Sequence, residues 1–202
     1  MKAVDVLMHE HRVIEKVLGA LETYVADVEK GRDVPLKDLA EFVTFIREFA
    51  DRCHHGKEED ILFAAMVEHG FSKEMGPVAV MLHEHAEGRR LVRALVEAAK
   101  QPGWTADLRR GVVENARAYA DLLEAHIKKE DSILYPMAEQ RLPHDRMEAM
   151  AEEFEAFEAN IMGKGVHEQY HALADKLIAR YAGNAPHTPA CHHGHTHNHA
   201  ST

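Results

Sequence analysis

Residues 54–63 read His-His-Gly-Lys-Glu-Glu-Asp-Ile-Leu-Phe, and residues 126–135 repeat this pattern as His-Ile-Lys-Lys-Glu-Asp-Ser-Ile-Leu-Tyr. A shorter motif precedes each copy, since the triplet His-Glu-His occurs at residues 9–11 and again at residues 83–85. The triplets are offset by 74 residues, from 9 to 83, and the longer motifs by 72 residues, from 54 to 126. Two motifs that recur at nearly one period indicate a duplicated structural unit.

Helix-forming residues dominate both copies and the segments around them. Breakers interrupt this composition at residues 31–35, 70–72, 102–104 and 142–144. We therefore predict five helices, over residues 4–30, 36–69, 73–100, 106–141 and 145–181. Short connections force neighbouring helices to run antiparallel, so the expected fold is an all-α, up-down-up-down four-helix bundle with an additional C-terminal helix. Gly163 and Gly165 should break or bend that last helix.

The chain of 202 residues has room for one domain of ordinary size and a tail. Residues 1–182 would form the bundle with its fifth helix. Residues 183–202 would form a flexible tail, which holds six of the 17 histidines. Such a His-rich tract can bind Zn²⁺, Ni²⁺ or Cu²⁺.

Composition excludes several classes of partner. The formal net charge is −10, and no stripe of Lys and Arg is present to bind nucleic acid. No apolar run approaches the roughly 20 residues that cross a bilayer, and charges and histidines interrupt residues 1–12 before a signal peptide could form. We therefore expect a cytoplasmic protein without a membrane partner. Cys53 and Cys191 are too few for a disulfide framework, and Cys53 fits a small core position.

Helical phase separates the histidines of the repeated triplets. On the first predicted helix His11 falls in the apolar stripe that faces the core, whereas His9 lies about 160° away. On the third predicted helix His85 falls in the stripe and His83 lies on the far side. We therefore expect His11 and His85 in the core, and His9 and His83 at the surface.

A carboxylate joins the histidine on the fourth predicted helix. His126 and Glu130 lie one turn apart in the same apolar stripe as Ile133. Burying a carboxylate without a partner costs on the order of several kcal/mol, so a glutamate at this position requires a cation. A metal ion would supply it.

The second predicted helix offers two pairs with the same spacing. The repeat aligns His54 and Glu58 with the pair on the fourth helix, so we predict that His54 and Glu58 face inward. His55 and Glu59 lie one step around the helix and are the alternative pair. In the chosen assignment His55 lies at the surface.

The inward stripes bring four imidazoles and two carboxylates together: His11, His54, Glu58, His85, His126 and Glu130. One tetrahedral zinc ion cannot use so many ligands. Two metal ions fit better, because each histidine can bind one ion from the side while each glutamate bridges the pair. Imidazole and carboxylate ligands with open coordination positions favour iron, with manganese or zinc as substitutes.

Together these motifs resemble the hemerythrin-like, or HHE cation-binding, domain over about residues 4–139. Members of that family are four-helix bundles that hold a non-haem di-iron centre with oxo or hydroxo and carboxylate bridges. The resemblance implies that the six residues above are its ligands. The chain departs from oxygen-carrying hemerythrins at Arg89, where their third helix has a second histidine, and at Glu130, since they use an aspartate five positions after the histidine. One histidine is therefore missing.

The fifth predicted helix offers a replacement. His167 lies on the face that would dock against the bundle, either as a further metal ligand or as a histidine that caps the bundle end through a hydrogen bond. His171 is a poorer candidate for a ligand. Tyr24 and Tyr119 fit core packing better than chemistry.

We therefore expect a di-iron protein that binds a small diatomic ligand, O₂ or NO, or peroxide, in sensing or in the response to oxidative or nitrosative stress. One alternative is a redox enzyme that turns over peroxide or NO, or that helps to repair iron–sulfur centres. Another is a metal storage protein with the tail as collector. No motif for an organic cofactor or a catalytic nucleophile competes with these functions.

Overall fold

The computed structural model describes residues 3–161, 163 and 165–182, and the regular elements in this part of the chain are helical. The predicted all-α class is therefore confirmed. The predicted tail, residues 183–202, lies outside the described residues. None of the helices in the described part combines the length and apolar character of a bilayer-crossing segment.

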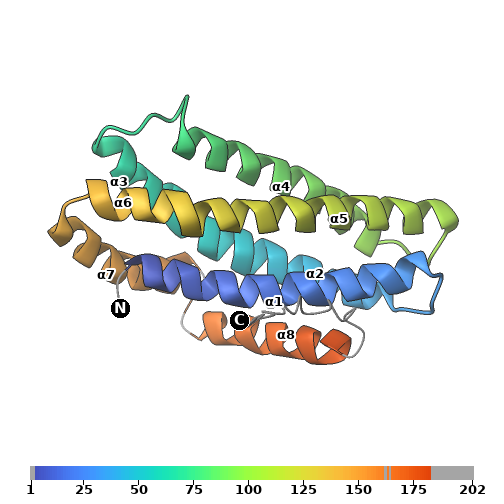
Figure 1. The fold of residues 1–202 in the computed structure, drawn as a ribbon. Helices are drawn as coiled ribbons and strands as arrows, with labels where there is room; N and C mark the ends of the chain where they lie inside the picture. The colour runs from blue at the N-terminus through green and yellow to red at the C-terminus, as the bar shows by residue number, and fades with distance from the viewer. Residues whose placement is uncertain (1–2, 162, 164, 183–202) are drawn as a thin grey trace, which may run out of the picture.

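Two of the long helical rods contain π-helical stretches, which we denote η; Figure 1 labels the α-helices. The elements in chain order are α1 (Ala3–Glu29), α2 (Leu36–Phe45), η1 (Ile46–His55), η2 (Glu58–Leu62), α3 (Phe63–Glu68), α4 (Pro77–Ala99), α5 (Ala106–Lys129), η3 (Glu130–Leu134), α6 (Tyr135–Arg141), α7 (His144–Ile161) and α8 (Val166–Tyr181). The rods α1, α2 to α3 and α5 to α6 begin and end at or next to the predicted residues.

Glycine and proline set the remaining helix boundaries. α4 begins at Pro77, later than predicted, because Gly76 before it has a φ of +80° and proline suits the first helical position. The predicted break in the last helix is present. Gly163 and Gly165, with φ values of +89° and +78°, separate α7 from α8.

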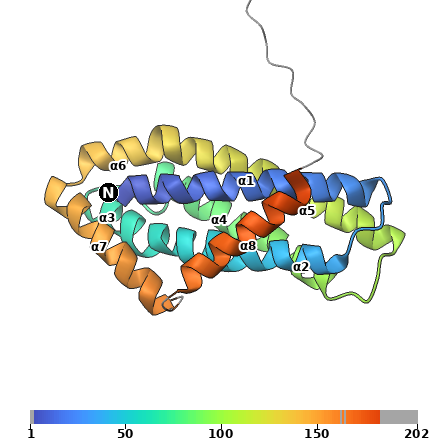
Figure 2. The same cartoon turned by 90° about the horizontal axis from the view of Figure 1, so that it is seen from below.

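Four long rods lie side by side, and the C-terminal helices pack on the outside. α1 lies against α5, and α4 lies against α5 and α2. Figure 2 shows α8 running diagonally across α1 and α2. Its last residue, Tyr181, packs against Tyr24 and Phe42, with ring centroids 5.5 and 5.6 Å away, and donates a hydrogen bond to Asp38.

Two apolar cores fill opposite ends of the bundle. One includes Leu18, Phe42 and Leu123, and the other includes Leu7, Phe63 and Met150. Between the two cores lies a layer of buried polar and charged side chains. Apolar burial stabilises the two ends by about 25 cal/mol per Å². The polar layer needs a different source of stabilisation.

The polar layer coincides with the π-helical stretches. η2 and η3 occupy equivalent positions of the sequence repeat, since each begins at the glutamate of its motif. A π-helical turn closes its hydrogen bond one residue later than an α-helical turn, so the side chains that follow rotate away from the α-helical phase. For this reason Ile133, which the α-helical phase places in the core, is 51% exposed.

Candidate metal centre

The buried polar layer brings seven side chains together from the four long rods. They are His11 of α1, His54 and His55 of η1, Glu58 of η2, His85 of α4, His126 of α5 and Glu130 of η3. None of them is more than 5% exposed. Six are the residues predicted from helical phase and the repeat, and the structure places all six at one point in the bundle.

The seven side chains form two groups. The two-histidine group contains His11, His54, Glu58 and Glu130. The three-histidine group contains His55, His85, His126 and Glu58. Within each group the potential ligand atoms lie within 4.8 Å of one another, which is close enough for them to surround one ion.

Glu130 spans the two groups. Its Oε2 atom lies 3.3 Å from Nε2 of His11, and its Oε1 atom lies 3.1 Å from Nε2 of His126. His11 belongs to the two-histidine group and His126 to the three-histidine group. One carboxylate thus presents one oxygen to each group, as a bridging ligand of two metal ions must do.

Glu58 also faces both groups. Its Oε2 atom lies 3.7 Å from Nε2 of His54 and 3.5 Å from Nε2 of His85. Its Oε1 atom accepts a hydrogen bond of 2.7 Å from the hydroxyl of Tyr135. That hydroxyl also lies 3.3 Å from Nε2 of His11, so Tyr135 stands beside the two-histidine group. The sequence had given no role to Tyr135.

The predicted surface position of His55 is wrong. The side chain is buried, and its ring stacks on that of His85 with centroids 3.9 Å apart and 15° between the planes. The π-helical η1 explains the difference, because its wider turns bring the consecutive residues His54 and His55 to the centre together. The repeat could not indicate this, since it aligns His55 with Ile127.

Replacing His55 with alanine should reduce the bound metal by about half, because the three-histidine group loses an imidazole while the two-histidine group keeps all its ligands. Metal analysis of the purified variant after dialysis against a weak chelator measures this loss. His9→Ala, which removes an exposed histidine, is the matched control. Equal metal content in His55→Ala and the parent protein would show that His55 is not a ligand.

A carboxylate from a neighbouring rod anchors the outer nitrogen of each of the four predicted histidines. The contacts, each from an imidazole Nδ1, are His54 to Glu10 at 2.8 Å, His126 to Glu84 at 2.9 Å, His11 to Asp131 at 2.7 Å and His85 to Glu59 at 2.7 Å. An ionised carboxylate can only accept, so each imidazole donates its Nδ1–H and directs the lone pair of Nε2 at the centre. The sequence did not predict these anchors, although each one directly neighbours a predicted ligand in the chain.

The carboxylates that anchor the histidines have lysine partners at equivalent positions of the repeat, but α7 covers only one of the two. Lys57 binds Glu10, and Lys129 binds Glu84 at the equivalent position. The side chain of Lys129 is 36% exposed, whereas Lys57 is fully buried and also donates to Glu158 of α7 at 2.5 Å. α7 therefore covers one half of the pseudo-symmetric centre and leaves the equivalent place in the other half open.

The two glutamates carry unequal charge in the absence of a cation. Burial and the neighbouring Glu130 raise the pKa of Glu58 well above its usual range. Burial also acts to raise the pKa of Glu130, but His126 and His11 outweigh it and hold that pKa well below its usual range. Two buried carboxylates this close cannot both ionise without a cation, so Glu58 holds a proton that a metal ion would displace.

Most of the histidines are held in the form that binds metal. Burial, with the neighbouring His85, lowers the pKa of His55 to about 3. Burial also lowers the pKa of His54 and of His85. For His11, burial is outweighed by the neighbouring carboxylates, chiefly Asp131, which raise its pKa to about 9. A neutral imidazole is the form that ligates, so a metal ion must displace a proton only where a carboxylate holds it.

Four buried atoms at the centre have no hydrogen-bond partner among the described residues. They are His55 Nε2, Glu58 Oε2 and both carboxylate oxygens of Glu130. A buried polar atom left without a partner costs about 1–3 kcal/mol, and more when it is charged. Imidazole nitrogens and carboxylate oxygens are ligands of iron, manganese and zinc, so the residues present fit a pair of such cations.

His167 does not join the seven side chains. Its Nδ1 atom donates to Glu158 at 2.7 Å, and it lies in a third group with Glu10 and Cys53. α8 crosses the outside of the bundle, and the buried ammonium of Lys57 lies between the carboxylates of this group and supplies their positive charge. Of the two predicted roles, the position of His167 fits the hydrogen bond rather than a ligand of the buried centre. Cys53 is buried, as predicted.

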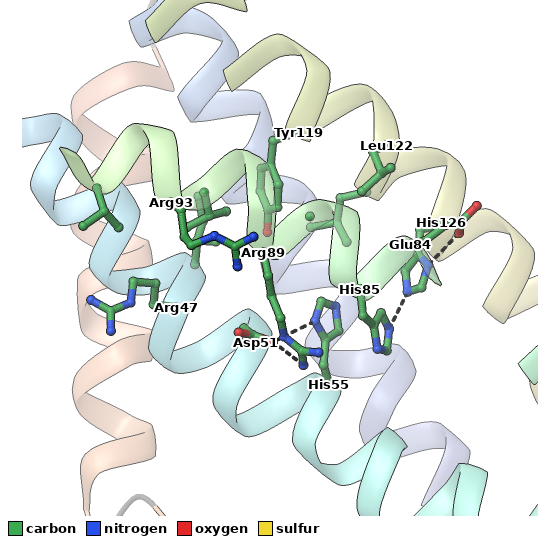
Figure 3. Close-up of a pocket in the computed structure, with 15 residues that line it drawn as sticks. Arg47, Asp51, His55, Glu84, His85, Arg89, Arg93, Tyr119, Leu122 and His126 are labelled. Atoms are coloured by element: carbon green, nitrogen blue, oxygen red, sulfur yellow. Dashed lines mark hydrogen bonds and ion pairs between the residues drawn. The ribbon is translucent and has the colours of Figure 1, made fainter. Parts of the chain in front are cut away.

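A cavity of about 230 Å³ adjoins the three-histidine group (Figure 3). His55, His85 and His126 line one end, and Arg47 and Arg93 line the other. Arg89, which stands where oxygen-carrying hemerythrins have a histidine, instead donates to Asp51 and Glu59, at 2.8 Å each. Tyr119 is buried in the wall of the cavity, and Tyr24 lies in an apolar core, so both take the predicted packing role.

The profile of the hemerythrin HHE cation-binding domain matches residues 2–138, which contain all seven side chains. The chain belongs to this family. Its relatives include uncharacterized proteins of Mycobacterium tuberculosis and Mycobacterium bovis, 24% identical over 176 residues, which cover 87% of this chain and 67% of those proteins. An Escherichia coli protein named iron-sulfur cluster repair protein YtfE is 29% identical over 133 residues, which cover 64% of this chain and 59% of that protein. No solved structure matches the chain.

Proposed function

We propose that the seven buried side chains hold two iron ions, one in each group, bridged by Glu58 and Glu130. Support comes from the oxygens of Glu130, which face different groups, and from the buried atoms that have no hydrogen-bond partner among the residues that the structure describes. Manganese or zinc would use the same donor atoms and are the expected substitutes. We also infer from the short connections that the four long rods run up-down-up-down, as in hemerythrin-like bundles.

The two groups offer unequal numbers of ligands. With both glutamates shared, the two-histidine group provides four protein ligands and the three-histidine group provides five. An iron ion that accepts up to six ligands therefore keeps more open positions in the two-histidine group. This inequality is the observation that carries our functional proposal. A small exogenous ligand would bind on the side of His11 and His54.

Tyr135 is placed to act on such a ligand. Its ring stacks on that of His11 with centroids 5.5 Å apart and 10° between the planes. Burial and the neighbouring Glu58 raise the pKa of Tyr135 well above its usual range, so the hydroxyl stays protonated and can donate. We infer that this hydroxyl turns from Glu58 to donate a hydrogen bond to the exogenous ligand.

The function that this geometry supports best is binding of O₂, NO or peroxide, in sensing or in the response to oxidative or nitrosative stress. When bound, iron supplies the open coordination positions and the redox chemistry. The chain orients the imidazoles through the carboxylate anchors, holds the centre between two apolar cores, and provides one buried hydroxyl donor beside the two-histidine group.

Replacing Tyr135 with phenylalanine should accelerate NO release from the reduced, iron-loaded protein by about tenfold, because one hydrogen bond of about 1.4 kcal/mol is lost. Stopped-flow measurement of the NO dissociation rate checks this value. Tyr119→Phe removes a buried hydroxyl from the cavity wall and should leave the rate unchanged. Equal rates in Tyr135→Phe and the parent protein would show that Tyr135 does not donate to the bound ligand. An iron-loaded protein that binds no NO, O₂ or peroxide would refute the binding function.

Repair of iron–sulfur centres is a second candidate, favoured by the similarity to the protein named for that role. If the protein repairs iron–sulfur centres, iron should leave the centre when the protein is mixed with a damaged iron–sulfur protein. Iron content before and after incubation with a nitrosylated iron–sulfur protein separates the two candidates. Transfer of iron with recovery of the damaged protein supports repair, whereas iron that stays bound supports ligand binding.

A further inference from the structure

Two histidines on the outer helix α8 face one another. His167 and His171 lie one helical turn apart, and their Nε2 atoms are 2.9 Å apart. Their rings are parallel, with centroids 4.8 Å apart. Both side chains are partly exposed. Neither histidine belongs to the seven side chains of the buried centre.

The two imidazoles are held in place before any ligand arrives. Both rings pack edge-on against Phe49 of η1, with centroids 5.3 and 5.2 Å from it. Glu158 of α7 accepts from Nδ1 of His167 at 2.7 Å. Because that carboxylate accepts from Nδ1, Nε2 is the nitrogen of His167 left to ligate once its hydrogen bond with His171 opens.

The same pattern distinguishes the buried centre. There, a carboxylate accepts from the Nδ1 atom of each imidazole, and the Nε2 atoms of His85 and His126 approach to 3.0 Å. Such a carboxylate partner fixes the tautomer of a metal-binding histidine and raises its basicity. α8 thus repeats two features of the buried centre: the carboxylate on Nδ1 at His167, and the close approach of two Nε2 atoms.

We propose that His167 and His171 form a second metal site, which binds a single divalent copper or nickel ion and is separate from the buried centre. Two nitrogens at right angles about a metal, each at 2.0–2.1 Å, are about 2.9 Å apart, which is the observed separation. Square-planar or tetragonal geometry of this kind is typical of Cu²⁺ and Ni²⁺. Tetrahedral zinc would need the nitrogens about 3.3 Å apart.

The two imidazoles differ in protonation before a metal ion binds. Burial, with the neighbouring His167 and His9, lowers the pKa of His171, so His171 offers a neutral ring. The hydrogen bond to Glu158 raises the pKa of His167, so in the metal-free protein His167 is the protonated ring, and its Nε2–H donates to the neutral Nε2 of His171. The metal ion replaces that proton, which leaves as H⁺, and both imidazoles then bind as neutral ligands. Water completes the coordination.

The inner group next to His167 is a weaker candidate. Glu10 and Glu158 there already bind the buried ammonium of Lys57, so a second cation would have to expel that lysine. Among the described contacts, the Nε2 atoms of His167 and His171 face one another and no lysine or arginine. The proposed site therefore lies between the two Nε2 atoms, on the face of α8 that packs against Phe49 of η1.

The test is a titration of the full chain, with the buried centre loaded, with Cu²⁺ followed by NMR. Paramagnetic broadening reports the position of the ion, so binding at α8 is distinguished from binding at the histidines after residue 182. Backbone amide signals of residues 166–175 should broaden at a Cu²⁺ concentration at least tenfold lower in the parent protein than in His171→Ala. His144→Ala, which removes an exposed histidine one turn from Glu148, is the matched control and should behave as the parent.

A second variant tests the arrangement itself. Glu158→Gln should weaken Cu²⁺ binding at α8 by about ten- to a hundredfold, as loss of a carboxylate partner does at other metal sites. Broadening of the α8 signals that persists unchanged in His171→Ala, or no broadening in the parent protein, would overturn the proposal. Metal content of the buried centre, measured in the same samples, should not change in His171→Ala, so failure here is distinct from failure of the proposed function.

Discussion

Replacing Glu130 with alanine should remove at least half of the bound metal, the largest loss that we expect from one substitution. Both oxygens of Glu130 lack hydrogen-bond partners in the described part of the chain, and they face histidines of different groups at 3.3 and 3.1 Å. Each metal ion therefore loses a ligand, and the centre loses the carboxylate whose pKa is held low by His11 and His126. Iron content per chain, measured after purification without added metal, checks this result.

Two further variants on the rod from α5 to α6 serve as controls for the loss of metal in Glu130→Ala. Glu124→Ala removes a half-exposed glutamate of α5 outside the centre and should leave the metal content unchanged. Glu130→Gln keeps the size of the side chain and one oxygen donor, so it should retain more metal than Glu130→Ala. Metal content in Glu130→Ala equal to that of the parent protein would mean that Glu130 bridges nothing.

Removing the metal with a chelator at neutral pH should lower the melting temperature by about 10 °C. A ligand present at about a thousand times its dissociation constant stabilises the folded state by about 4 kcal/mol, and each kcal/mol shifts the melting temperature of a chain of this size by about 2–4 °C. The cations neutralise the buried carboxylates of Glu58 and Glu130, which no other described residue satisfies fully. Calorimetry of the metal-loaded and metal-free protein checks the shift.

The Glu58→Gln variant separates metal binding from general damage to the bundle. Glu58 holds a proton in the metal-free protein, because burial and Glu130 raise its pKa, so an uncharged amide should change the metal-free melting temperature little. The gain on adding metal should shrink in Glu58→Gln, because the amide is a weaker bridge. A metal-free parent protein as stable as the metal-loaded one would contradict the role of the cations in folding.

The sequence could predict the residues that obey α-helical phase and the repeat. His11 and His85 follow from the stripe on their own helices, and both are buried as expected. The repeat then selects His54 and Glu58 from two pairs with identical spacing, and both are buried. Burying a glutamate costs much more free energy than burying a leucine. A glutamate in an apolar stripe therefore indicates a specific partner, whereas a leucine there indicates only the core.

The residues that the sequence missed depend on features that helical phase does not contain. His55 reaches the centre only because η1 is π-helical, and the same effect at η3 turns Ile133 outward. Helical phase predicts which way a side chain points on its own helix, but not which residue of a neighbouring helix it contacts. Contacts such as Glu10 to His54 were therefore not predicted. The sequence also did not predict the path of α8 across the outside of the bundle. This path separates His167 from the centre.

Anomalous X-ray scattering at the iron edge, from crystals of the protein purified without added metal, tests the central claim most directly. We predict two anomalous peaks per chain in the polar layer. One should lie within bonding distance of Nε2 of His11 and of His54. The other should lie within bonding distance of Nε2 of His55, His85 and His126, with carboxylate oxygens of Glu58 and Glu130 reaching both. A single peak, or peaks only outside this layer, would contradict the account.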